Sequence, residues 1–231
     1  ICLKARHVNN HIYDKAFITG CDKNTQWMLD WFLDGYYKHN DTPIIFADFG
    51  ITKTYKQKLQ ESKRFHCILN FKEKKVSGWF LKPIAMFNSP SIKTVWLDTD
   101  IEILGDISGI FDELVPGKLS MVEDKAWTKR RPKHGTWHNS GVVGFINKPQ
   151  ILSRWARQVV DNPRDGDQEV LYNMLDQIEK MTYINDLHNK YNVTRLQHLD
   201  KTVPREILMN HWTGYKGKLH IADLIDNTIG E

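Results

Sequence analysis

The amino-acid sequence predicts an α/β layer fold with a mixed, mainly parallel central sheet flanked by helices. Short apolar runs alternate with segments of helical hydrophobic spacing, and this alternation is typical of parallel strands joined by helices. The 231 residues are enough for one domain with a full hydrophobic core. The runs that we expect to be buried strands are 16–19, 43–47, 65–69 and 94–97.

The segments between these runs are expected to be helices. Met28, Trp31, Phe32 and Tyr36 recur at helical spacing, and Asp22 or Thr25 is the candidate N-cap. Residues 52–63 and 79–87 are the next two helices. Pro83 lies near the start of the second, where proline is tolerated.

The second half of the chain continues the pattern with one break. We expect helices around 110–114, over 149–160 and from 167, and strands over 119–122 and in the glycine-rich stretch 139–147. Glycines inside a strand indicate that another group approaches it closely. Residues 125–138 are predicted to be a loop rich in basic and aromatic residues. The loop is either solvated, or a lid and acceptor platform carrying Trp127, Trp137 and the basic run 129–131.

Composition narrows the function class. A net charge of +4 is compatible with an anionic small ligand and too small to favour nucleic acid. The three cysteines, Cys2, Cys21 and Cys67, have no disulfide or zinc spacing, so a reducing, cytoplasmic location is expected. No apolar run approaches the ~20 residues of a membrane span. Asn192 begins a glycosylation sequon, a triplet common by chance.

The most informative stretch is the apolar run 94–97 followed by Asp98, Thr99 and Asp100. Residues i and i+2 of a strand point to the same side, so both carboxylates can converge on one ligand. Paired carboxylates at the end of a buried strand favour a divalent cation such as Mg²⁺ or Mn²⁺. The alternative is a solvated turn, and the spacing alone is not specific because Asp165 and Asp167 repeat it.

Ligands of such sheets bind at the carboxyl ends of the strands. Asp98 and Asp100 follow one strand, and the turn from Thr19 to Asp22 follows another. We therefore expect them to share a cleft.

Four separated pieces together resemble a known family. They are 94–100, Asn-Ser-Gly-Val at 139–142, Asp-Gln-Glu at 167–169 and His-Trp-Thr-Gly at 211–214, with lysines after the last. In this order they resemble the GT-A glycosyltransferases, most closely family 8, which includes glycogenin and lipopolysaccharide galactosyltransferases. The resemblance implies one Rossmann-like GT-A domain over 1–231, with a nucleotide-binding half at about 15–122 and a sugar and acceptor half at about 123–231.

The resemblance also implies roles for individual residues. Asp98, Asp100 and His211 would hold Mn²⁺ or Mg²⁺, and Asp167 and Gln168 would lie beside the anomeric carbon as catalytic residues. The family has a lysine where this chain has Gly217, so either Lys216 or Lys218 would contact the phosphates. The residues expected to bind the donor are Thr19, Asp22, Lys82, Asp98, Thr99, Asn139, Gly214, Lys216 and Lys218.

The implied reaction transfers a sugar, with retention of configuration, from a nucleotide-sugar such as a UDP-sugar to a carbohydrate or other hydroxyl acceptor. One rival is a Mg²⁺-dependent phosphatase-like hydrolase with Asp98 as nucleophile and Asp100 as acid, but Glu102 and the mid-chain position depart from that pattern. A sugar nucleotidyltransferase would need a glycine- and arginine-rich loop after the first strand, which 19–22 does not supply. The last rival is a non-catalytic carbohydrate-binding module.

Overall fold

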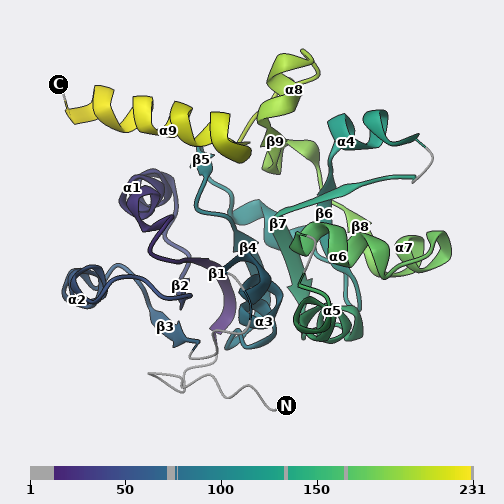
Figure 1. Cartoon of the computed structure of the whole chain (residues 1–231), viewed down its shortest axis with the longest axis horizontal. Coiled ribbons are helices and arrows are strands. Elements are labelled where there is room, and N and C mark those ends of the chain that lie inside the picture. The colour runs from purple at the N-terminus through teal and green to yellow at the C-terminus, as the bar shows by residue number, and fades with distance from the viewer. Residues whose placement is uncertain (1–12, 72–75, 77, 133–134, 164–165, 230–231) are drawn as a thin grey trace.

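The computed structural model describes residues 13–71, 76, 78–132, 135–163 and 166–229. Its centre is a seven-stranded sheet in the order β3-β2-β1-β4-β7-β6-β8 (Figure 1). β7 runs antiparallel to both of its neighbours, β4 and β6, and the other pairs in this sheet are parallel. The strands are β1 (Tyr13–Cys21), β2 (Ile44–Asp48), β3 (Cys67–Asn70), β4 (Ser91–Leu97), β6 (Leu119–Glu123), β7 (His138–Ile146) and β8 (Ile184–Asp186).

Apolar layers cover both faces of this sheet, which is why its inner strands read as continuous apolar runs. Ile18 and Trp96 belong to the layer beneath α3 (Lys82–Phe87) and α5 (Gln150–Asp161). Phe17 belongs to the opposite layer, which packs against α1 (Leu29–His39) and α2 (Lys53–Ser62). The predicted α/β fold is confirmed.

A second, three-stranded sheet has the order β5-β10-β9. β10 (Met209–His211) is antiparallel to β5 (Ile101–Ile103) and parallel to β9 (Val193–Thr194). The last helix, α9 (Gly214–Ile229), starts three residues after β10. In Figure 1, β5 and β9 lie above the large sheet, on the side where α8 and α9 lie. The small sheet thus pairs β10, late in the chain, with β5, the strand that directly follows Asp100.

The remaining elements are short. They are η1 (Gln26–Met28), η2 (Gly78–Leu81), η3 (Ser108–Asp112), α4 (Lys125–Arg130), α6 (Asp167–Asn173), α7 (Gln177–Tyr183), η5 (Asn189–Tyr191) and α8 (Arg195–Leu199). Among the described residues, no helix has the length and apolar character needed to cross a membrane.

The prediction of a continuous loop over 125–138 is wrong. Residues 125–130 form α4, because Asp124 caps the helix by accepting the backbone N–H of Trp127 at 3.1 Å. Trp137 is only 3% exposed, and its ring stacks on that of Tyr172 with centroids 3.5 Å apart. Trp137 is therefore a core residue and not an acceptor platform. Cys2, His134 and Asp165 lie outside the described residues.

Candidate active site

A cavity of about 400 Å³ lies at the carboxyl ends of β1 and β4. The predicted site residues that line it are Asp22, Lys82, Asp98, Thr99, Asp100, Asn139, Asp167, Gln168, His211, Gly214 and Lys218. Thr19 does not line it; its side chain is fully buried in β1, one residue before the strand reaches the cavity. The expectation that the two strand ends share a cleft is confirmed.

Asp98 and Asp100 do not continue β4 as the sequence pattern predicted. The strand ends at Leu97, and the residues up to Asp100 form a turn. The chain turns here because it changes sheets: the N–H of Asp98 donates to Gly141 of β7 at 2.9 Å, and the carbonyl of Asp100 accepts from Trp212 at 3.0 Å. The two carboxylates nevertheless converge on His211.

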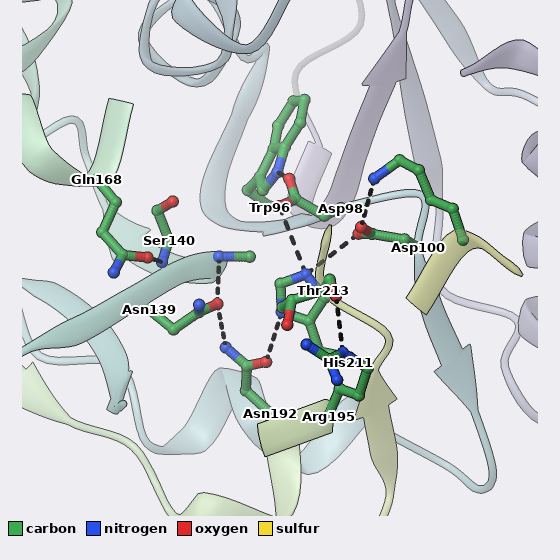
Figure 2. Close-up of polar contacts among 12 residues, drawn as sticks. Trp96, Asp98, Asp100, Asn139, Ser140, Gln168, Asn192, Arg195, His211 and Thr213 are labelled. Carbon is green, nitrogen blue, oxygen red and sulfur yellow. Dashed lines mark hydrogen bonds and ion pairs between the residues drawn. The ribbon is translucent and has the colours of Figure 1, made fainter. Parts of the chain in front are cut away.

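Asp98, Asp100 and His211 form a group of three potential metal ligands (Figure 2). His211 Nε2 lies 3.1 Å from Asp100 Oδ1 and 3.9 Å from Asp98 Oδ2, and one ligand atom from each residue lies within 4.8 Å of the others. A cation held at about 2.1 Å by each ligand requires spacings of this order. Two carboxylates suit Mn²⁺ or Mg²⁺ and the imidazole is compatible with Mn²⁺, so the residues present fit the expected metal.

The charges around the two carboxylates are unequal. Burial raises the pKa of Asp98, and Asp100 raises it further, although Lys82 and His211 act in the opposite direction. Burial also acts to raise the pKa of Asp100, but His211 and Lys218 overcome this and hold it below its usual range. Lys82 and His211 therefore do not fully compensate the negative charge of Asp98, and an added cation would stabilise it.

Lys82 links the carboxylate pair to the predicted catalytic residues. Its side chain is almost fully buried, and Nζ lies 3.0 Å from Asp98 Oδ1 and 3.1 Å from Asp167 Oδ2. Burial alone would lower the pKa of Lys82, but Asp167 and Asp98 raise it above its usual value. The ammonium group therefore stays charged and holds the carboxylates of Asp98 and Asp167 in one wall of the cavity.

The Asn-Ser-Gly segment supports the site from β7. Ser140 donates its backbone N–H to Gln168 Oε1 at 3.1 Å, which places the Gln168 amide at the cavity wall (Figure 2). Gly141 lies directly under the imidazole, where a Cβ would come within 2.1 Å of His211 Cε1. The close approach predicted from the glycines is thus made by His211.

The two candidate lysines occupy different positions. Lys218 lines the cavity and its Nζ donates to Asp100 Oδ2 at 3.3 Å, whereas Lys216 is exposed and does not line it. A lysine could not replace Gly217, because a Cβ there would lie 1.8 Å from the carbonyl oxygen of Trp212. The departure from the family pattern therefore follows from the packing of α9, and Lys218 reaches the site instead.

Sequence reasoning missed several residues that line the cavity. Trp79 is 61% exposed and borders it, as does Glu169 of α6. Trp127 of α4, which the sequence offered as a lid or acceptor-platform residue, also lines the cavity. An exposed tryptophan at the start of a predicted helix was the available signal for Trp79. Asn192, which holds His211, gave no such signal because their contact joins positions 19 residues apart.

Comparison with known proteins gives a fold assignment. No family model matches the chain, and no curated protein matches it in sequence. The galactosyltransferase LgtC, solved with donor and acceptor sugar analogs, matches with a TM-score of 0.63 at 12% identity over 92% of this chain and 95% of that one. GlyE of Streptococcus pneumoniae TIGR4 matches with a TM-score of 0.64 at 18% identity, over 87% of this chain and 55% of that one.

A third solved structure, mouse xyloside xylosyltransferase 1, matches with a TM-score of 0.56 at 13% identity, over 87% of this chain and 97% of that one. Each of these proteins is a glycosyltransferase by its description. At such low identities the likeness establishes the fold, and the predicted GT-A fold is confirmed.

Proposed function

We propose that this chain is a metal-dependent glycosyltransferase that moves a sugar from a nucleotide-sugar, with a UDP-sugar as the expected donor, to a hydroxyl group of a carbohydrate or other acceptor. The observation that carries the proposal is the convergence of Asp98, Asp100 and His211 in one cavity with Asp167 and Gln168. The shared GT-A fold supports it independently.

In this proposal, different residues of the cavity bind different parts of the donor. A Mn²⁺ or Mg²⁺ ion bound by Asp98, Asp100 and His211 would neutralise the charge of a diphosphate leaving group. Lys218 adds a second positive charge at the same end of the cavity, next to Asp100. The nucleotide half of the proposed donor site is about 15–122, where Asp22 lies at the cavity wall, and the sugar and acceptor half is about 123–231.

We also propose that the reaction retains the anomeric configuration by front-face attack. A double displacement needs a carboxylate nucleophile at the anomeric carbon. Gln168 is a neutral amide whose Oε1 already accepts from Ser140, and Asp167 is paired with Lys82. In this proposal Gln168 supports the developing positive charge, and Asp167 holds sugar hydroxyls with Lys82.

A donor panel tests the proposal. The protein, Mn²⁺ and a mixture of carbohydrate acceptors are incubated with each nucleotide-sugar, and release of nucleoside diphosphate is measured. We expect turnover of a UDP-sugar that stops in excess chelator. When that donor is α-linked, we expect an α-linked product by NMR. Release of inorganic phosphate from phosphate esters without diphosphate release would favour the phosphatase, and sugar binding without turnover would favour the binding module. A β-linked product from an α-linked donor would overturn retention.

The two lysines of α9 provide a matched pair of variants. Lys218→Ala removes a charge that faces the cavity, so kcat/KM for the donor is expected to fall about 10–100-fold, the scale of one charged hydrogen bond. Lys216→Ala removes the same charge from the exposed side of the helix and should change kcat/KM by less than about twofold. Steady-state kinetics over a range of donor concentrations measure both. Equal losses in the two variants would contradict the assignment of Lys218.

A further inference from the structure

The imidazole of His211 is held by a chain of buried amides on the side away from the two aspartates. His211 Nδ1 lies 3.0 Å from Asn192 Oδ1, and Asn192 Nδ2 lies 2.9 Å from Asn139 Oδ1. Asn139 Oδ1 also accepts the backbone N–H of Gly141 at 2.9 Å. Figure 2 shows the contacts that join Asn139, Asn192 and His211, and the residues Asn192 and His211 are 1% and 4% exposed.

The backbone amide at the end of this chain fixes the orientation of every member. The N–H of Gly141 can only donate, so the Asn139 atom that faces it must be the oxygen. That oxygen can only accept, so Asn192 must present its NH₂ group to Asn139 and its oxygen to His211. An amide oxygen cannot donate, so His211 must carry a proton on Nδ1.

We infer that Asn192 is a positioning residue that keeps the proton on Nδ1 of His211 and thereby reserves Nε2 for the metal. The inference rests on the proposed metal-dependent function. Nε2 is the ring nitrogen that faces Asp100 and Asp98, at 3.1 and 3.9 Å. A ring whose other nitrogen donates a fixed hydrogen bond is held in one orientation and binds a metal more strongly.

The small sheet places Asn192 where it can bond Nδ1 of His211. β9 begins directly after it and pairs in parallel with β10, with His211 opposite Thr194. Asn192 is thereby placed beside the ring and away from solvent. A glycan on Asn192 is incompatible with this fold, because its amide nitrogen points inward to Asn139. The sequon at 192–194 therefore has a structural explanation and marks no glycosylation site in the folded chain.

Spectroscopy of the unmodified protein tests the inference directly. Imidazole ¹⁵N resonances are recorded without metal and with Zn²⁺, a diamagnetic probe, and those of His211 are assigned with His211→Gln among the ten histidines. We expect Nδ1 to be protonated in both states and the Nε2 resonance to shift to the value of a metal-bound nitrogen when Zn²⁺ is added. An unprotonated Nδ1 in either state would overturn the inference.

A pair of variants tests the consequence for metal binding. Asn192→Leu keeps the approximate shape but removes the acceptor, so Mn²⁺ affinity measured by calorimetry is expected to fall about 10–100-fold. Asn40→Leu is the matched control: Asn40 is 8% exposed, and within the described part of the chain its side chain bonds only Tyr36, Gly105 and Ile107, which do not line the cavity. It should lower thermal stability but leave Mn²⁺ affinity unchanged.

The outcomes separate the inference from the proposed function. If the wild-type protein does not bind Mn²⁺, the metal-dependent function itself fails. If it binds Mn²⁺ and Asn192→Leu binds it equally well, the function stands and the role of Asn192 fails. A fall in affinity that Asn40→Leu shows to the same extent would mean that lost stability, not the hydrogen bond to His211, is responsible, and would also overturn the inference.

Discussion

Asp100→Asn is expected to lower turnover with a nucleotide-sugar by at least ~100-fold, equivalent to about 2.7 kcal/mol in the activation barrier. The Asp100 carboxylate contacts both His211 and Lys218. One oxygen lies 3.1 Å from His211 Nε2 and the other 3.3 Å from Lys218 Nζ. The substitution keeps the shape of the side chain but removes the negative charge. It also turns an NH₂ group toward one of these donors or toward the cation.

The loss is expected mainly in kcat, because charge neutralisation matters most as the diphosphate leaves. Mn²⁺ affinity should fall as well, since one of three ligands becomes neutral. Asp106→Asn is the control: Asp106 is exposed, accepts a hydrogen bond from the backbone of Ser108 and does not line the cavity. Full activity of Asp100→Asn in excess chelator would refute the metal assignment.

The local sequence was sufficient to locate the aspartate pair and the strands that lead to it. The run 94–97 is apolar on both faces because both faces of β4 are buried, and Phe17 and Ile18 of β1 point into opposite apolar layers for the same reason. Such patterns depend only on neighbouring residues, so they can be read without a structure.

The parts that could not be predicted depend on contacts between distant segments. The turn at Asp98–Asp100 arises because the chain passes from one sheet to the other, and the hydrophobic pattern of β4 contains no sign of that change. Trp137 was expected at the surface because it shares a predicted loop with the basic run 129–131, but it stacks on Tyr172 of α6. The choice of Lys218 over Lys216 depends on which side of α9 faces the cavity and Asp100.

Gly141 contacts both Asp98 and His211, two of the candidate metal ligands. Its substitution is therefore expected to lower Mn²⁺ affinity strongly. Its carbonyl oxygen accepts the N–H of Asp98, its N–H donates to Asn139, and its Cα faces the His211 ring. In Gly141→Ala, a methyl group would lie 2.1 Å from Cε1 and 2.5 Å from Nδ1 of His211. The ring cannot move aside without breaking its contacts with Asn192 and Asp100.

Gly144→Ala is a matched control on the same strand. Its methyl group would meet Leu114 Cδ2 at 2.3 Å, the flexible end of a core side chain that does not line the cavity. Both variants should lose about 1–3 kcal/mol of stability from overpacking, measured by denaturant unfolding without metal.

Only Gly141→Ala is expected to affect the metal. Displacing a ligand costs at least as much as losing a residue that supports one, so Mn²⁺ affinity should fall by at least ~100-fold in Gly141→Ala and stay unchanged in Gly144→Ala. Calorimetry on the two folded variants measures this difference. Wild-type Mn²⁺ affinity in Gly141→Ala would show that His211 is not a ligand, since the displaced ring could not bind as before. The metal would then have to be held by Asp98 and Asp100 without it.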